Sequence, residues 1–342
     1  MAQLPQALLN GMESLLRGRA QGALTADAQA VSARYRTQTG RGARLLTTPG
    51  EAAAYAASRM PATWAAAQRA LQLSAACLPG FAPRALLDVG AGTGAAAWAA
   101  CGVFPTIERA ALLEREAAMR AAGQALAQAG PEALRAASWT AADLADPALT
   151  LPDLGGGPAL ATACYVLGEL TEAQQDAVLP RLYAAADALL LVEPGTPAGF
   201  ARLGRARAQL AALGAQVAAP CPGGSLCPGG SLCPGGCLCA MEGDAWCRFA
   251  VRVERTRLHR ALKGGEAPFE DETFCFLTVA RAGAAPAPAR VLRHPQAMKG
   301  HVALALCTPQ GLRRRVVGRS ERAAYRLARD AFAGAAWTEP DE

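Results

Sequence analysis

Short apolar runs alternate with longer segments of helical periodicity from residue 84 onward. Each short run predicts a buried strand, and each longer segment predicts a helix packed on the resulting sheet. The predicted strands cover 84–90, 109–114, 138–144, 159–167, 187–195, 215–220 and 274–281, and the predicted helices between them cover 94–104, 115–130, 171–186 and 200–214. Repeated strand–helix units of this kind predict an α/β fold, with a mostly parallel sheet and helices on both faces.

The segments on either side of this alternation have different patterns. The N-terminal part is rich in helix formers with repeated apolar spacing, which predicts a helical extension. The C-terminal part predicts a small basic β unit, with a hairpin at 301–308 and 312–320 and a last helix at 321–337. We therefore expect a helical region at 1–80, an α/β domain at 81–282 and a β-hairpin unit with its final helix at 283–342.

Six of the chain's 11 cysteines lie in one short stretch that follows the sixth predicted strand. They are Cys221, Cys227, Cys233, Cys237, Cys239 and Cys247. The repeated Cys-Pro-Gly-Gly motif predicts a surface loop at 220–247, because neither a helix nor a central strand tolerates so much proline and glycine. Clustered cysteines hold a metal or cluster, or form disulfides. Nothing here indicates export, and a reducing compartment favours metal ligation.

Charge is distributed unevenly along the chain. Residues 248–319 contain 14 Lys and Arg against 5 Asp and Glu, whereas the remainder has a balance of −3 within an overall net charge of +6. A basic C-terminal third predicts a surface that faces a polyanion, with RNA as the first candidate and no DNA expected. The alternative is a solvated basic face that has no partner.

The N-terminus and the hydropathy predict where the protein is found. Residues 1–20 lack a basic start followed by an apolar run, so no secretory signal is expected. No stretch approaches about 18 uninterrupted apolar residues, so no membrane span is expected either. A cytoplasmic protein is the simplest interpretation.

A glycine-rich turn after the first predicted strand is the clearest binding motif. The stretch has Asp88 followed by Gly90, Gly92 and Gly94. Glycines at this spacing let the backbone bend tightly and approach a ligand closely. The pattern differs from that of dinucleotide enzymes and is similar to the first motif of S-adenosylmethionine-dependent methyltransferases. That resemblance implies that the turn meets the methionine part of the cofactor, and that Asp88 contacts the cofactor directly or through water.

Two further acids occupy positions that match the same family. Glu114 ends the second predicted strand, where the family places an acid on the ribose hydroxyls. Asp143 follows the third strand, where the family contacts the adenine amino group. The alternative is that both are ordinary surface acids at strand ends. By resemblance, then, S-adenosylmethionine is the expected cofactor.

The sequence indicates little catalytic machinery for methyl transfer. Asn10 is the sole asparagine, which excludes the asparagine form of the motif that amino-group methyltransferases carry after strand four. At that place Glu169 is the candidate base, or alternatively a helix-start acid. Whether the chain transfers a methyl group, transfers it poorly or only binds the cofactor stays open.

Several segments together resemble one family. They are Ala54-Tyr55, Arg59 to Thr63, the glycine turn, Tyr165 to Leu170, Leu191 to Pro197, Ala219 to Pro222, Trp246 to Phe249, Phe269 to Glu272, Lys299-Gly300 and Cys307. This combination resembles the methyltransferase-like protein associated with the small subunit of mitochondrial ribosomes, in a bacterial form. The resemblance implies a Rossmann-like class I methyltransferase fold, a four-iron four-sulfur cluster on four cysteines, and binding to small-subunit rRNA during ribosome assembly.

The family's cysteine spacing maps onto this chain in more than one way. Its pattern, with five and then seven residues between the first three cysteines and a distant fourth, implies Cys233, Cys239, Cys247 and Cys307 as ligands. Cys221 and Cys227 are substitutes, because Cys221 keeps the family's Ala-Pro-Cys-Pro lead-in and Cys227 keeps the proline that follows. By spacing alone, four thiolates suit an iron–sulfur cluster and zinc equally. The resemblance favours iron–sulfur over zinc.

The basic residues supply the expected RNA contacts. We expect Arg248, Arg252, Arg255 and His259 to share one face of a helix after Cys247. A second patch comprises Arg313, Arg314 and Arg315. The first hypothesis is a ribosome-assembly protein whose cluster fastens the loop to the C-terminal hairpin. The alternatives are an active methyltransferase on rRNA or a small molecule with a structural metal, and a non-enzymatic zinc-bound RNA-binding module.

Overall fold

The computed structural model describes residues 1–37, 46–222, 247–263 and 266–340. The chain divides into two compact units, each made of segments that are distant in sequence. The first unit comprises Met1–Leu71, Ala82–Glu193 and Val251–Glu272, and the second comprises Gln72–Phe81, Pro194–Ala250 and Thr273–Glu342. Each unit is described below by itself.

The first unit is built on a parallel sheet in the order β3-β2-β1-β4-β5. Its strands are β1 (Ala85–Val89), β2 (Arg109–Glu114), β3 (Ser138–Ala141), β4 (Ala159–Cys164) and β5 (Ala188–Pro194). Every residue of β1 and β4 is buried, as expected for parallel strands covered on both faces. The Rossmann-like α/β architecture predicted from the alternating pattern is therefore confirmed.

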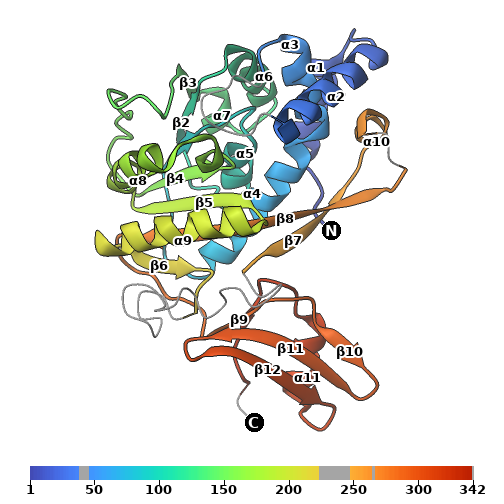
Figure 1. The fold of residues 1–342 in the computed structure, drawn as a ribbon, viewed down its shortest axis with the longest axis vertical. Helices are drawn as coiled ribbons and strands as arrows, with labels where there is room; N and C mark the ends of the chain where they lie inside the picture. Colours follow the sequence, from blue (N-terminus) through green and yellow to red (C-terminus); the bar gives the residue numbers. More distant parts are fainter. Residues whose placement is uncertain (38–45, 223–246, 264–265, 341–342) are drawn as a thin grey trace. The chain divides into compact units, whose positions relative to one another are not determined.

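The helices of the α/β part follow the strands as predicted (Figure 1). They are α5 (Ala95–Val103), α6 (Ala117–Ala127), the short α7 (Glu132–Arg135) and α8 (Glu172–Ala185). Helices α5 and α8 contact β4, and α6 contacts β2 and β3. Helix α8 starts at a capping box, in which Thr171 and Gln174 satisfy each other's backbone amides.

The predicted helical extension is also confirmed. It comprises α1 (Gln6–Leu16), α2 (Gln21–Thr37), α3 (Pro49–Ser58) and α4 (Met60–Ala75). Helix α3 begins at a second capping box, made by Thr48 and Glu51. Among the helices that the structure describes, none is both long enough and apolar enough to cross a membrane.

The second unit contains the expected C-terminal hairpin within a larger sheet. Strands β11 (His301–Thr308) and β12 (Gly311–Gly318) form the hairpin, and β9 (Ala289–Val291), β10 (Gln296–Met298) and β13 (Ala336–Trp337) complete the sheet. Helix α11 (Arg322–Asp330) packs on it through a core that includes Val302, Leu304 and Val317. This unit also contains α9 (Pro197–Ala212) and β6 (Gln216–Ala219), which is antiparallel to the end of β8 (Phe269–Ala280).

Two predicted helices are wrong in extent or in kind. The segment expected to form a basic helix after Cys247 instead forms β7 (Phe249–Glu254), and only then the short α10 (Arg257–Lys263). Burial alternates residue by residue along β7, which pairs with β8, so the period of two overrides the arginine spacing. The last helix ends at Asp330 rather than at 337, where β13 has formed.

Candidate functional site

The glycine turn lies at the carboxyl end of β1, at the edge where α/β sheets bind ligands. Gly90, Gly92 and Gly94 have φ angles of +64°, +57° and +85°, which residues with a Cβ rarely adopt. A Cβ on Gly90 would lie 2.4 Å from a methyl group of Val166. The turn therefore requires glycine for its shape and for its contact with the segment after β4.

Asp88 supports the turn from inside the sheet. Its side chain is 1% exposed, and the Thr162 hydroxyl donates a hydrogen bond of 2.7 Å to its Oδ1. Burial raises the pKa of Asp88 to about 7, although the hydrogen bond from Thr162 opposes that shift. Asp88 is therefore a buried carboxyl on the strand that leads into the glycine turn.

Glu114 lies directly against the glycine turn. Its Oε2 accepts a hydrogen bond of 2.8 Å from the Gly92 amide, and its Oε1 accepts one of 2.7 Å from the Glu116 amide. Burial raises the pKa of Glu114, while these two amides oppose the rise. The carboxylate at the end of β2 is therefore held beside the turn.

Asp143 lies beyond β3, close to the residue that follows Glu114. Its Oδ1 accepts a hydrogen bond of 2.9 Å from the Ala145 amide, and its Oδ2 is 3.6 Å from the Arg115 guanidinium. The structure thus gathers the ends of β1, β2 and β3 at one edge of the sheet. The acids predicted to hold the cofactor all lie along this edge.

Glu169 ends the 3-10 turn η1 (Leu167–Glu169), which follows β4. Burial raises its pKa to about 7, and the nearby charge of Glu114 adds to the rise. A carboxyl group with a pKa near neutrality suits general acid–base chemistry. Glu169 therefore has the electrostatic character of a base near neutral pH, at the place where the sequence suggested one.

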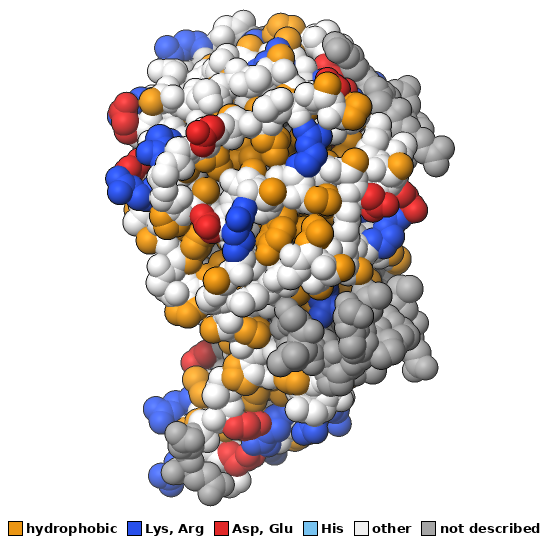
Figure 2. Space-filling view, turned by 90° about the vertical axis from the view of Figure 1, so that its left-hand side faces the viewer, with side chains coloured by type: hydrophobic (Ala, Val, Ile, Leu, Met, Phe, Trp, Pro, Cys, Tyr) orange, Lys and Arg blue, Asp and Glu red, His pale blue; other side chains and the backbone are white. Residues whose placement is uncertain are grey.

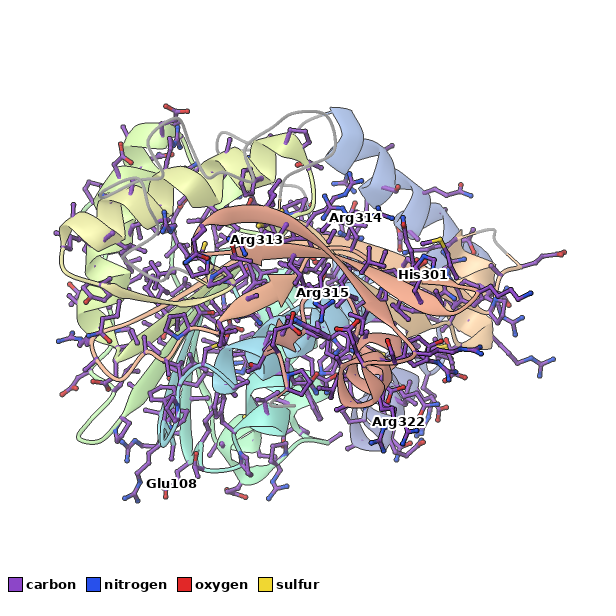
Figure 3. The ribbon with its side chains drawn as sticks, turned by 90° about the horizontal axis from the view of Figure 1, so that it is seen from below. Glu108, His301, Arg313, Arg314, Arg315 and Arg322 are labelled. Atoms are coloured by element: carbon purple, nitrogen blue, oxygen red, sulfur yellow. The ribbon has the colours of Figure 1, made fainter. Side chains whose placement is uncertain are left out.

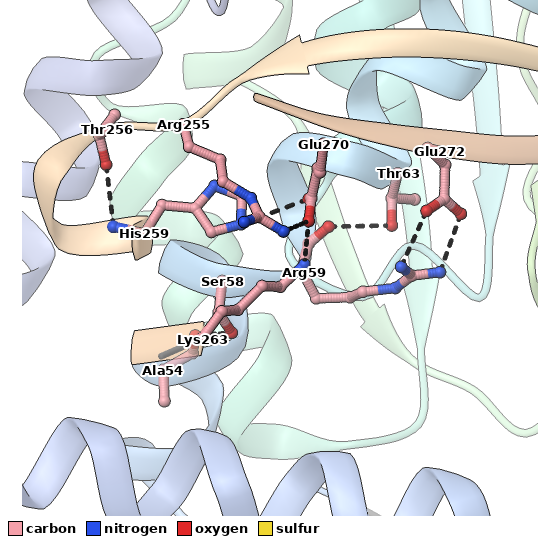
Figure 4. Close-up of polar contacts among 10 residues, drawn as sticks. All are labelled: Ala54, Ser58, Arg59, Thr63, Arg255, Thr256, His259, Lys263, Glu270 and Glu272. Atoms are coloured by element: carbon pink, nitrogen blue, oxygen red, sulfur yellow. Dashed lines mark hydrogen bonds and ion pairs between the residues drawn. The ribbon is translucent and has the colours of Figure 1, made fainter. Parts of the chain in front are cut away.

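Tyr165 is a feature of this edge whose geometry the sequence did not reveal. It is the one described non-glycine residue with positive φ, at +59°, a conformation that costs free energy. Its hydroxyl donates a 3.0 Å hydrogen bond to Glu272 Oε1. Arg59 holds the same carboxylate through two bonds of 2.9 Å (Figure 4), and its guanidinium lies 5.8 Å from the centre of the Tyr165 ring. The sequence separates Arg59 and Glu272 by 213 positions, so no local pattern could have paired them.

The structure describes the two ends of the cysteine-bearing segment, which belong to the second unit. Cys227, Cys233, Cys237 and Cys239 lie outside the described residues. Cys247 and Cys307 are buried and Cys221 is half-buried. None of the described cysteines forms a disulfide, and the described donors alone include no group of three that could hold a metal.

Two arginines tie both ends of this segment to the neighbourhood of β9. Arg290, in β9, donates 2.9 Å from its Nε to the carbonyl of Pro220, the residue before Cys221. Arg293 donates to the carbonyl of Arg248 at 3.4 Å, immediately after Cys247. Cys307 on β11 is paired directly with Arg290. The start of the segment therefore lies beside the strand that pairs with Cys307, and its end is held by Arg293, just after that strand.

The basic residues after Cys247 face acids rather than forming one helical face. Arg252 makes two 2.8 Å bonds to Asp271. Arg255, at 2.8 Å, and Lys263, at 2.6 Å, both bind Glu270 Oε2, and His259 Nε2 lies 3.3 Å from its other oxygen (Figure 4). The predicted helical face of Arg248, Arg252, Arg255 and His259 is therefore wrong. Arg252 lies on the strand β7, whereas His259 lies on the separate helix α10, so the residues do not share one helix.

The second basic patch is divided between two roles. Arg315 pairs with Glu321 and, at 2.8 Å, with Glu339. Arg313 and Arg314 are exposed on β12 (Figure 3), and neither has an ion pair among the described residues. On the face of the molecule in Figure 2, described acidic and basic side chains are interspersed.

Comparison with known proteins gives a family but no close relative. A search of curated proteins finds no match. Among solved structures, magnesium protoporphyrin IX methyltransferase from Synechocystis shares 14% identity over 75% of this chain and 100% of its own, with a TM-score of 0.38. Precorrin-6y C5,15-methyltransferase from Geobacter metallireducens shares 15% identity over 62% of this chain and 86% of its own, with a TM-score of 0.37. The sequence model of the family described as mitochondrial small ribosomal subunit Rsm22 matches residues 49–338, and the chain belongs to that family.

Proposed function

We propose that this chain is a cytoplasmic, S-adenosylmethionine-binding, methyltransferase-like protein that binds small-subunit rRNA during ribosome assembly. In this proposal a metal centre on the cysteines fastens the Cys-rich segment to the C-terminal unit. The observation that carries the proposal is that Arg290 on β9, opposite Cys307, holds the start of that segment, and Arg293 just after β9 holds its end. The family membership supplies the link to the small ribosomal subunit.

Cofactor binding is assigned to the edge formed by the glycine turn and the three strand-end acids. Gly90, Gly92 and Gly94 leave room for close approach of the cofactor backbone, and Asp88 fixes the turn from below. Glu114 would accept the ribose hydroxyl protons and Asp143 would meet the adenine amino group. The placement of Glu114 on the Gly92 amide supports this role, because the carboxylate already lies beside the turn.

A metal on four thiolates fits the described surroundings. Cys247 is 7% exposed and Cys307 9% exposed, so both thiols lie within the protein, where thiolates are shielded from solvent. The Arg290 contact brings the residue before Cys221 to the strand that pairs with Cys307, and Arg293, just after that strand, holds the residue after Cys247. The chemistry of the donor set, soft thiolates alone, suits an iron–sulfur cluster or zinc.

We assign the ligands to Cys233, Cys239, Cys247 and Cys307, with Cys221 and Cys227 as substitutes. When bound, the group supplies a rigid covalent link between the segment and the C-terminal sheet. The chain's own part is to hold Cys307 on β11 and to anchor the segment's ends. We favour a four-iron four-sulfur cluster over zinc on the family resemblance.

RNA binding is assigned to β12 and the open face of its sheet. Strand partners share a face, and Arg314 lies opposite the exposed Ala305. Leu312 and Val316, which are 45% and 42% exposed, lie on the same face as Arg314, because residues two apart on a strand point the same way. An exposed guanidinium between apolar groups offers a phosphate contact and a surface for bases. Arg313 points to the opposite face, so the two arginines would contact RNA phosphates from the two sides of β12.

The test is anaerobic purification followed by measurement of affinity for small-subunit rRNA fragments. We expect about four irons with matching sulfide per chain, and weaker RNA binding after Cys247→Ser. Cys101→Ser is the matched control, since Cys101 lies on α5 in the first unit. An RNA affinity unchanged by Cys247→Ser, in protein that has lost its metal, would overturn the link between the metal centre and RNA.

A second candidate, an active methyltransferase, is favoured by Glu169 and Tyr165. The near-neutral pKa of Glu169 and the strained backbone of Tyr165 lie together after β4, the place where the acceptor would enter. Transfer of a labelled methyl group to rRNA, lost in Glu169→Gln with cofactor binding retained, would support it. Binding of S-adenosylmethionine without any transfer supports the first proposal instead.

A further inference from the structure

Arg290 is a buried cation without an acidic partner among the described residues. Its side chain is 1% exposed and is among the largest fully buried side chains of the described residues. Its three contacts are the carbonyls of Pro220 and Gly334, each at 2.9 Å, and the sulfur of Cys77, at 3.4 Å. No carboxylate within the described ranges forms an ion pair with it. By contrast, Arg252, Arg255 and Arg315 lie against glutamate or aspartate, and Arg313 and Arg314 are exposed.

This arrangement is costly unless something negative lies nearby. A guanidinium cannot lose its proton in a protein, so burial cannot be relieved by neutralisation. Carbonyl oxygens satisfy its hydrogen bonds but do not balance its charge, and an uncompensated buried ion costs several kcal/mol. We therefore looked for an anion that belongs to the same neighbourhood.

Three cysteine-bearing segments meet at this guanidinium. Cys77 contacts it directly, and Pro220 places the start of the Cys-rich segment on it. Cys307 is the residue opposite Arg290 on the adjacent strand, so both side chains leave the same face of the sheet. A divalent metal with four thiolates, or an iron–sulfur cluster with four thiolates, carries net negative charge. Such a centre would supply the negative charge that the described residues do not provide beside Arg290.

We propose that Arg290 is the internal countercharge of the thiolate-bound metal centre, and a positioning residue for it. The inference rests on the proposed metal centre and adds a residue that is not a ligand. Arg290 stabilises the negative centre electrostatically, and its donors hold the start of the Cys-rich segment in place. With an iron–sulfur cluster, the positive charge favours the more negative, reduced state and therefore raises the reduction potential.

The test compares charge with geometry at position 290 in the full-length, anaerobically purified protein. Arg290→Lys keeps the charge but loses the planar fork, whereas Arg290→Gln keeps an amide donor but loses the charge. The readouts are the rate of metal loss to a chelator, which serves either metal, and the midpoint potential of an iron–sulfur cluster. Arg315→Gln is the control, because its side chain leaves the opposite face of the same sheet and pairs with Glu321 and Glu339.

We expect Arg290→Gln to lower the potential and to speed metal loss, while Arg290→Lys and Arg315→Gln stay near the wild type. Equal effects of Gln and Lys would overturn the inference and leave Arg290 a purely geometric tie. Bound metal with both readouts unchanged in Arg290→Gln would also overturn it, without touching the proposed metal centre. Wild-type protein that holds no metal would overturn both proposals.

A second variant covers failure of Arg290→Gln to fold. Cys77→Asp keeps the arginine and places a carboxylate where the guanidinium now contacts sulfur, which neutralises the charge in place. We expect the same lowered potential and faster metal loss as for Arg290→Gln, and no change in Cys77→Ser. A cluster in Cys77→Asp with wild-type potential and stability would overturn the inference.

Discussion

The two basic regions of this chain, β7 with α10 and the strand β12, differ in what lies beside them. Arg252 on β7, Arg255 directly after it and Lys263 on α10 each bind an acid on β8. On β12, Arg313 and Arg314 have no ion pair among the described residues and are exposed. Both segments belong to the same basic third of the sequence. The acids on the neighbouring strand, and not the number of basic residues, therefore decide which basic side chains are left to bind a phosphate of RNA.

Glu270 is the central acid of the neutralised region, by which we mean the basic side chains of β7 and α10 together with the acids of β8 that bind them. Burial alone would raise its pKa, but hydrogen bonds from His259, Lys263 and Arg255 outweigh burial and hold its pKa well below the usual range. Because Arg255, Lys263 and His259 all lie against this one carboxylate, the site depends on Glu270 more than on any one of them. Removing the charge of Glu270 should therefore change the difference between the two regions most.

Glu270→Gln has the largest expected effect. It leaves Arg255, Lys263 and His259 together without their carboxylate, and we expect the free energy of unfolding to fall by about 2–3 kcal/mol at neutral pH, less than for a fully buried pair because solvent screens part of the cluster. Urea denaturation followed by circular dichroism measures this loss. A midpoint equal to that of the wild type would show that the cations are satisfied without Glu270.

Acid should weaken the same region in the wild type. A carboxyl group whose pKa is lowered on folding contributes stability that is present above its unfolded pKa and lost as the pH falls toward its folded pKa. Glu270 should therefore lose its contribution progressively below about pH 4.5, its ordinary value. Denaturation curves between pH 7 and pH 3 should show a steeper decline for the wild type than for Glu270→Gln. Parallel declines in the two proteins would contradict this assignment.

The sequence could predict features that depend on neighbouring residues, but not contacts between segments that are far apart in the chain. The apolar pattern predicted β1, β2 and their helices, because burial in a parallel sheet acts on every residue of such a strand. The glycine turn and Glu114 were predictable because both follow directly from adjacent strand ends. The contacts of Arg59 with Glu272, and of Arg290 with Pro220, were not, since they join segments far apart in sequence. The strand β7 was mistaken for a helix because arginine spacing was weighed above the alternation of Phe249, Val251 and Val253, which are all buried.

The exposed arginines of β12 provide the next test. Each phosphate contact that is removed should reduce the salt slope of RNA binding by about one unit. We therefore expect Arg313→Gln with Arg314→Gln to lower the slope by about two, and to weaken binding similarly for different RNA sequences. Arg252→Gln with Arg255→Gln is the matched control, with a smaller change in slope because both side chains already bind acids. A larger change in the control would reverse the comparison between the two strands.

The smallest expected effect is that of Asp271→Asn, which separates pairing from stability within the neutralised region itself. Asp271 binds Arg252 as closely as Glu270 binds Arg255, but about half of each side chain in the Asp271 pair is exposed. Solvent screens an exposed pair, so its removal should leave the urea midpoint unchanged within error. Arg252 would then be released to solvent, although it still lies 4.0 Å from the centre of the Phe269 ring. We expect RNA binding by Asp271→Asn to become slightly tighter and more salt-dependent, because one more cation is available. If RNA affinity and its salt slope both stay at the wild-type values, β7 lies outside the RNA surface whatever its charge, and β12 alone carries the contact.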